Sequence, residues 1–301
     1  MKKQKNLTAG NVIFNIINYT IFGLFTIICI FPFYYILINT ISDNKLVSMG
    51  RIMFVPQGIH FENYISAFRI KNLPNAAFIS LSRTVLGTVL VIIASSFPGY
   101  TLSKKEFWHR RFWYRFIVAT MYFNAGIIPV YVTYKNLGLI NNYLVYLLPS
   151  MVSPFNLVLC KTYIESIPQS LEESAEIDGA GYFIRFTRII FPLIKPIVAT
   201  IAVFSAVGHW NAFMDTVLYT SKTKLFTLQY ILYLYLNEAT ALAEVIKSDP
   251  AAGANIDPAT MLTPTAVRYT ITMITVLPVL FVYPFFQKYF IKGIMLGAVK
   301  G

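Results

Sequence analysis

The sequence has few charged residues. Only 13% of its 301 residues are Asp, Glu, Lys or Arg, whereas soluble domains carry about 25%. Acidic residues are the scarcer sign, with 13 Asp and Glu against 25 Lys and Arg. Because 56% of the residues are hydrophobic, the composition excludes an ordinary soluble domain and indicates a membrane protein.

Residues that carry catalysis or bind metals are also few. The two cysteines, Cys29 and Cys160, lie in separate apolar runs, so neither a disulfide framework nor a zinc site is predicted. The histidines at positions 60, 109 and 209 are scattered, and no catalytic constellation can be assembled around them. A phosphate-binding G-x-x-x-x-G-K-[ST] loop is missing as well. We therefore expect no enzymatic activity and no metal or cofactor bound by this chain.

Long apolar runs dominate what is present. A membrane-spanning helix needs about 20 mostly apolar residues, and we predict an all-α membrane protein with six such helices in one domain, 1–301. The first run follows a basic segment but is too long for a signal peptide and has no small-residue cleavage site, so we expect it to be retained. The predicted spans are 13–38, 78–98, 112–132, 144–164, 194–214 and 266–286.

The basic residues predict an orientation. They flank the apolar blocks rather than interleaving with aromatics, so we read them as membrane-flanking charge and expect no nucleic-acid partner. Most fall at the two chain ends and in two short connections, 103–115 and 164–195. Because basic loops face the cytoplasm, we expect a multi-pass plasma-membrane protein with both termini cytoplasmic. The longer segments 42–75 and 215–264, the latter with a helix at 228–236, would then lie outside.

One connection, 164–196, differs from the rest of the chain. It holds five of the 13 acidic residues, and Pro168 with Ser170 begins a helix whose first turns are acidic. Gly179 and Gly181 permit a sharp turn before a second, mixed helix. A helix–turn–helix of this kind either fits a groove in another protein or forms an interfacial hairpin that joins two spans, and these physical features leave both open.

At these residues the chain resembles the permease subunits of binding-protein-dependent ABC importers. Their EAA signature reads E-A-A, three residues, G, nine residues, I-x-L-P. Every spacing is kept here, with Ser replacing the first Ala and Phe replacing Leu, at Glu173, Ser174, Ala175, Gly179, Ile189, Phe191 and Pro192. Segments along the whole chain are similar to the carbohydrate-uptake branch, relatives of the maltose permease's second subunit, and to its Gram-positive oligosaccharide subgroup: FVPQG (54–58), Trp210 with Asn211, QKYFIKG (287–293) and the terminal GAVKG.

The resemblance implies a type I importer fold whose 165–193 loop docks into a separate ABC ATPase dimer. ATP and Mg would be used by that ATPase, with Glu173 as its electrostatic contact and Gly179 setting the turn. The other implied partners are a second, different permease subunit, an extracellular or lipid-anchored sugar-binding protein, and a carbohydrate substrate, in particular an oligosaccharide. The implied coupling residues are Glu172, Glu173, Ser174, Ala175, Asp178, Gly179, Ala180, Ile189 and Pro192.

Polar side chains inside the predicted spans are candidates to line a sugar passage. Aromatic rings stack on sugar faces and amides bind hydroxyls, and the candidates are Asn124, Asn156, Trp210 and Asn211. The alternative for each is a helix–helix hydrogen bond worth about 0.6 kcal/mol. Arg83 also lies inside a span, near its outer end, and we expect its side chain to snorkel to the membrane surface.

Two other classes of function stay open at this point. A self-contained secondary transporter or channel would need buried ionisable residues to couple an ion gradient, and Asp215 is the only acid near the centre or end of a span. A membrane enzyme would need a clustered active site, which the sequence does not supply. The importer subunit is therefore the preferred hypothesis.

Overall fold

The computed structural model describes residues 9–70, 72–237 and 265–281, and within these ranges all regular secondary structure is helical. The predicted all-α class is thereby confirmed. The chain divides into two compact units, one formed by Met1–Arg69 with Tyr235–Ile274 and the other by Ile70–Leu234 with Thr275–Gly301. Each is described by itself below.

The first unit is built on one long apolar helix, α1 (Ala9–Thr40). Most of its side chains are exposed, among them Phe25 and Ile28. Only its carboxyl-terminal end packs, where Ile38 joins Val47 and Ile52 in a small core that Tyr269 also contacts. Two short helices follow, α2 (Asn44–Ser48) and α3 (Glu62–Arg69). The apolar surface of α1 is therefore left for lipid or for another protein.

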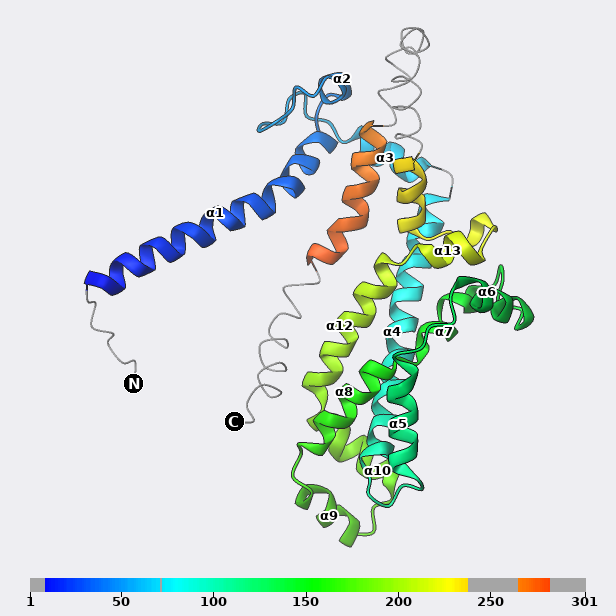
Figure 1. Ribbon diagram of the computed structural model, residues 1–301. Coiled ribbons are helices and arrows are strands. Elements are labelled where there is room, and N and C mark those ends of the chain that lie inside the picture. The colour runs from blue at the N-terminus through cyan, green and yellow to red at the C-terminus, as the bar shows by residue number, and fades with distance from the viewer. Residues whose placement is uncertain (1–8, 71, 238–264, 282–301) are drawn as a thin grey trace. The chain divides into compact units, whose positions relative to one another are not determined.

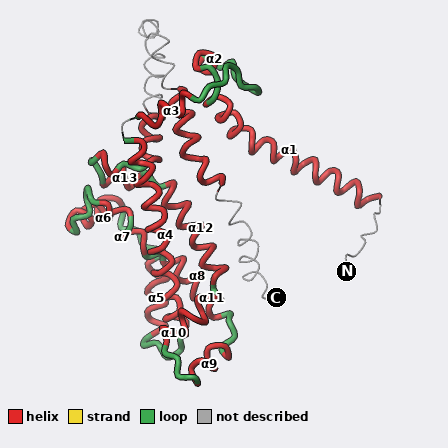
Figure 2. The backbone as a smooth tube through the Cα atoms, turned by 180° about the vertical axis from the view of Figure 1, so that it is seen from behind, coloured by secondary structure: helices red, strands yellow, loops and turns green. Residues whose placement is uncertain are grey.

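The second unit is organised around α4 (Leu73–Ser103). Figures 1 and 2 both show α4 side by side with α8 (Pro154–Glu165) and α12 (Lys195–Asn211). Small residues permit this close approach. A Cβ atom added at Gly99 would lie 2.9 Å from Cβ of Cys160, and one added at Gly87 would overlap the imidazole of His209.

The remaining elements of the second unit are shorter. The helix α5 is followed by a separate helix α6, and several elements of one or two turns precede or interrupt the later helices. A further helix begins at Leu228 and continues to the end of that described range, and the chain is helical again over Thr265–Phe281. The bounds are α5 (Arg110–Thr120), α6 (Ile127–Asn136), η1 (Tyr143–Tyr146), α7 (Leu148–Met151), α9 (Ser170–Ile177), α10 (Tyr182–Arg185), η2 (Phe186–Ile190, a π-helix), α11 (Phe191–Leu193), α13 (Met214–Tyr219) and η3 (Thr223–Leu225).

Some of the predicted spans coincide with long helices, and others coincide with bent or shorter ones. Among the described residues, α1 and α4 are each long and apolar enough to cross a membrane, and two bent helix pairs would bring the number to four. The bend is 43° between Tyr143–Met151 and Pro154–Glu165, and 79° between Tyr182–Leu193 and Lys195–Asn211. Proline stands at the start of α8 and of α12, where it permits a new helix to begin but not an old one to continue. The end of the predicted span 266–286 lies outside the described residues.

The expectation of one unbroken helix over 112–132 is wrong. The structure ends α5 at Thr120 and begins α6 at Ile127. Gly126, at φ 84°, adopts a conformation that other residues avoid, and its N–H donates to the Asn124 side chain at 2.9 Å. This Asn–Gly turn overrides the apolar run, and α6 lies to one side of the α4–α8–α12 group (Figures 1 and 2).

Candidate functional sites: an articulated loop and a polar cleft

The acidic helix α9 ends in a well-defined cap. The N–H of Gly179 donates to the carbonyl of Glu176 at 3.0 Å, and that of Ala180 donates to the carbonyl of Ala175 at 2.9 Å. This pair of bonds is the Schellman motif, which needs a left-handed residue after the helix, and Gly179 supplies it at φ 80°. Three of the predicted coupling residues, Ala175, Gly179 and Ala180, thus form the turn that ends α9.

The outer face of α9 is available to a partner. Glu173, Ser174 and Asp178 are exposed, and Ile177 is 86% exposed. An apolar side chain between carboxylates on a short helix at the end of the helical group is suited to a groove with an apolar floor and a basic rim. Figure 1 shows α9 at the far end of the helical group, next to α10.

Glu172 faces the opposite way. It is 7% exposed, and its carboxylate accepts hydrogen bonds from the Tyr100 hydroxyl and from Nζ of Lys104, both at the end of α4. The guanidinium of Arg185 lies 3.9 Å from the same carboxylate and 2.7 Å from that of Glu176. Two neighbouring acids of one helix turn, Glu172 and Glu173, are therefore in different surroundings.

The segment returning from α9 runs almost at right angles to α12. It comprises α10, η2 and α11, and the chain turns by 79° before α12 begins. Ile190 and Phe186 pack in the core with Tyr100, Cys160 and Ile194. The predicted coupling residues Ile189 and Pro192 are half-buried and exposed, respectively. A π-helix such as η2 widens the helical turn and is frequent at functional sites.

A polar cleft of about 420 Å³ opens in the second unit. Its wall combines hydroxyl, amide and imidazole groups with aromatic rings, together with one ion pair. The lining residues that carry this chemistry are Arg83, Tyr134, Tyr146, Ser150, Ser153, Asn156, Phe204, Ser205, His209, Asp215 and Tyr219. Such a mixture is typical of pockets that orient a polar ligand against flat apolar surfaces.

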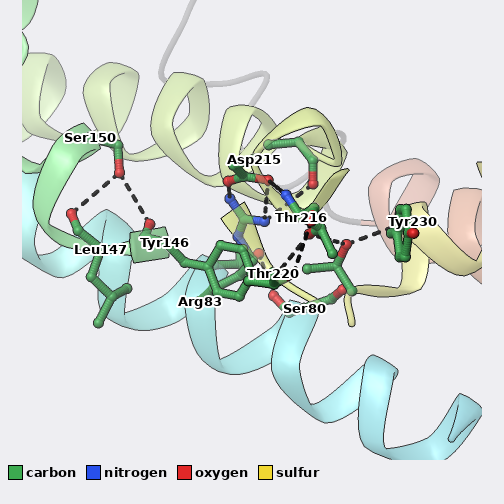
Figure 3. Close-up of polar contacts among 12 residues, drawn as sticks. Ser80, Arg83, Tyr146, Leu147, Ser150, Asp215, Thr216, Thr220 and Tyr230 are labelled. Atoms are coloured by element: carbon green, nitrogen blue, oxygen red, sulfur yellow. Dashed lines mark hydrogen bonds and ion pairs between the residues drawn. The ribbon is translucent and has the colours of Figure 1, made fainter. Parts of the chain in front are cut away.

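The expectation that Arg83 snorkels to the surface is wrong. Arg83 is 2% exposed and forms an ion pair with Asp215, with a second contact of 3.2 Å between Nη1 and Oδ1. The guanidinium also donates to the carbonyl of Ala212 at 3.2 Å and lies 4.4 Å from the ring centroid of Tyr146 (Figure 3). The charge is paired inside the protein instead of reaching water, because the carboxylate in the first turn of α13 is within reach.

Tyr146 extends this polar network. Its hydroxyl donates to the carbonyl of Leu225 at 2.7 Å and contacts the hydroxyls of Thr216 at 3.1 Å and Thr220 at 3.3 Å (Figure 3). These bonds join η1 to α13 and the segment after it. The floor of the cleft beside the ion pair is therefore held by hydrogen bonds as well as by packing.

Of the four predicted passage residues, one lines the cleft. Asn156, at 8% exposed, lies in its wall. Asn124 caps the turn at Gly126, as described above. Trp210 donates to the carbonyl of Thr275 at 2.9 Å, and Asn211 accepts a bond of 3.1 Å from Gln229. Trp210 and Asn211 thus make hydrogen bonds between helices, which is the alternative given for such residues, whereas Asn124 bonds within its own turn.

Sequence reasoning missed the partners of these groups. Tyr100 and Lys104 were not singled out, although their i, i+4 spacing places them on one helix face. His209 was set aside as scattered, and Gly87, against which it packs, was not considered. The available signal for the ion pair was one Arg and one Asp in otherwise apolar surroundings, because charges within a membrane usually pair. In the described part of the chain, no group of three or more His, Cys, Asp or Glu side chains could hold a metal ion.

The structure resembles a solved transporter over its full length. The match is to one chain in the crystal structure of a bacterial ABC transporter involved in the import of the acidic polysaccharide alginate, with a TM-score of 0.82 and 29% sequence identity, covering 95% of this chain and 100% of that chain. The fold is thus that of an ABC importer permease, of type I. In that class the chain is a transport component, not an enzyme.

Comparison with protein families gives the particular family. Residues 92–296 match the binding-protein-dependent transport system inner membrane component, and the chain belongs to this family. A similar protein is the polygalacturonan/rhamnogalacturonan transport system permease protein YtcP of Bacillus subtilis (strain 168), 31% identical over 97% of this chain and 99% of the relative. Protein LplC of the same organism is 32% identical over 98% of this chain and 97% of the relative. Family membership excludes the self-contained transporter or channel and the membrane enzyme.

Proposed function

We propose that this chain is one of two permease subunits of an ATP-driven oligosaccharide importer, coupled to its ATPase dimer through α9. The observation that carries the proposal is the exposed face of α9, where Glu173, Ser174 and Asp178 surround Ile177 on a helix ended by the Gly179 cap. The second permease is a different chain, and an extracellular or lipid-anchored binding protein delivers the sugar. ATP and Mg belong to the ATPase subunit.

The orientation follows from the basic residues. If α9 docks an ATPase, it lies in the cytoplasm, and so does the Ser103 end of α4 with its five basic residues in 103–115. Both chain termini then lie in the cytoplasm when six spans cross the membrane. The polar cleft, on the Arg83 side of α4, is nearer the outer face.

Oligosaccharides are the proposed substrate class. The relatives support this: besides YtcP, they include the arabinooligosaccharides transport system permease protein AraQ and the melibiose/raffinose/stachyose import permease protein MelC of Bacillus subtilis (strain 168). The cleft supplies matching chemistry, because Asn156 and the serines can bind hydroxyls while Tyr134 and Phe204 offer ring faces. We propose that it is this subunit's share of the passage.

Two substitutions test the coupling role. Glu173→Ala removes an exposed carboxylate, and Gly179→Ala forces a side chain into a left-handed conformation at a cost of about 1–2 kcal/mol, although the added Cβ meets no neighbour. We expect both to lower ATPase attachment, measured by co-purification, and to abolish uptake of a panel of trigalacturonate, arabinotriose and raffinose. Membrane insertion should be unchanged.

Glu62→Gln serves as the control for attachment. It removes an exposed acid of α3, outside the α9 loop, and should leave the ATPase bound. Normal uptake and ATPase attachment in both α9 variants would refute the coupling role.

A further substitution tests the cleft. Asn156→Leu removes one amide from the wall while keeping the side-chain size, and loss of a hydrogen bond of about 0.5–1.5 kcal/mol should lower the rate of uptake by about two- to tenfold. Asn136→Leu, at an exposed position of α6 outside the cleft, is the matched control and should import at the wild-type rate once expression is equal. Equal uptake by both variants and wild type would show that Asn156 does not contact the sugar in the passage.

A further inference from the structure

The helix α9 is attached to the rest of its unit by two short links and by two side chains, Glu172 and Glu176. The links are residues 166–169 before it and 178–181 after it. Within α9 itself, Glu172 is the one buried residue. Force from α9 therefore reaches the transmembrane helices through the links, through the pair of Glu176 with Arg185, or through Glu172, which alone of the two acids contacts Tyr100 and Lys104 at the end of α4.

The partners of Glu172 are fixed in place. Tyr100 is 2% exposed, and its ring lies 5.3 Å from that of Phe186 in the core between α4, α8 and the returning segment. Nζ of Lys104 lies 4.4 Å from the Tyr100 ring centroid, so the cation is held by the same aromatic side chain that donates to the carboxylate. Both belong to α4 or its immediate end, which makes the bond a direct contact between α9 and α4.

The charges of this contact are balanced. Glu172 and Glu176 face Lys104 and Arg185, two negative and two positive groups. Arg185 is 5% exposed, while the side chain of Glu176 is 60% exposed, so Glu172 is the buried counter-charge. A buried ion whose partner is removed is strongly disfavoured, and the contact consequently specifies the position of α9.

Glu172 is poorly placed to bind another protein. Its side chain is 9% exposed, and both carboxylate oxygens already accept hydrogen bonds within the chain. Glu173, one residue on, is exposed. Glu173 is therefore placed to contact a partner, and Glu172 is placed to transmit the partner's movement to the rest of the chain.

We propose that Glu172 is a positioning residue that clamps α9 to the end of α4, so that displacement of α9 moves α4 directly instead of bending the two links. The inference rests on the proposed function, in which α9 receives the movement of the ATPase. It removes Glu172 from the coupling contacts implied by the family resemblance and gives it, with Tyr100 and Lys104, a separate role.

The test uses the complete importer reconstituted in proteoliposomes, with Glu172→Gln and Tyr100→Phe. The first keeps the size of the side chain, and the second keeps the ring in the core, so both should fold and retain the ATPase. We expect oligosaccharide imported per ATP hydrolysed to fall at least about threefold, and amide hydrogen exchange of 170–177 to become about tenfold faster, as loss of one charge-assisted bond predicts. The double variant should be more severe than either single variant, because Glu172→Gln removes the bond with Lys104 while its amide oxygen still accepts from the Tyr100 hydroxyl, a bond that only Tyr100→Phe removes.

Controls separate this role from the others. Glu165→Gln removes two more exposed ion pairs, one with Lys161 within α8 and one of 3.4 Å with Arg110 of α5, and should leave import per ATP unchanged. The probe is the member of the trigalacturonate, arabinotriose and raffinose panel that the wild type imports fastest.

Three results would overturn the proposal. Wild-type import per ATP in both single variants, with or without faster exchange, would make Glu172 merely structural. Loss of ATPase attachment equal to that of Glu173→Ala would make it a docking residue. A wild-type complex that imports no member of the panel would overturn the proposed function and this inference with it.

Discussion

At the scale of single residues, the buried Arg83–Asp215 pair is the feature that matters most for stability. The guanidinium has almost no contact with solvent, and it is also held by the Ala212 carbonyl and the Tyr146 ring. Removal of one member of a buried pair costs about 3–5 kcal/mol, whereas replacing both by apolar groups of similar volume is often neutral. The pair thus contributes chiefly through the penalty for breaking it.

We therefore expect Asp215→Leu alone to destabilise the detergent-solubilised importer by about 3–5 kcal/mol, and Arg83→Met with Asp215→Leu to recover most of the loss. Thermal unfolding is monitored through the labelling of Cys160, which is fully buried in the folded chain. The Cys29→Ser background removes the other thiol of the chain. A double variant as unstable as the single one would show that the destabilisation arises elsewhere in the network.

At the scale of elements, close packing of α4 against α8 and α12 depends on positions without side chains. A Cβ at Gly87 would overlap the imidazole of His209, whereas one at Gly23 of α1 would meet nothing within 4 Å. The same substitution should therefore have opposite effects in two apolar helices of the same chain.

Gly87→Ala is expected to destabilise the chain by about 1–3 kcal/mol through overpacking, while Gly23→Ala should be neutral or stabilise α1 by up to about 1 kcal/mol. Thermal unfolding of the two variants side by side is the check. Gly87→Ala with His209→Ala should recover stability, because the second change makes room for the first. Equal melting temperatures for Gly87→Ala and wild type would mean that α4 and α12 can separate without cost.

The elements also show which structural features the sequence could predict and which it could not. Periodicity and run length were sufficient for α1 and α4, and the Gly179 turn was predictable because only glycine adopts its conformation freely. The break at Asn124–Gly126 was missed because the apolar run continues through it. The sequence analysis gave Glu172 and Glu173 the same coupling role. Adjacent residues point about 100° apart around a helix, so one of them can be buried while the other is exposed. Only tertiary packing decides which one is buried. The Arg83–Asp215 pair joins residues far apart in the sequence, which a single sequence does not place.

At the scale of the whole molecule, the exposed apolar surface of α1 and the exposed acidic face of α9 mark two different surroundings. Side chains such as Phe25 and Ile28 are more than half exposed, a state that is stable only against lipid or another apolar surface. The carboxylates of α9 need water or basic partners instead. The chain therefore needs two chemically different surroundings: an apolar one for α1, and water or a basic partner for α9.

The neutral Arg83–Asp215 pair also bears on electrical work. Moving one uncompensated charge across the full membrane potential changes the energy by about 2.3 kcal/mol per 100 mV. Because the two charges are bonded to each other, they are displaced together and their contributions cancel. The pair therefore adds no voltage-dependent energy when it moves with this unit.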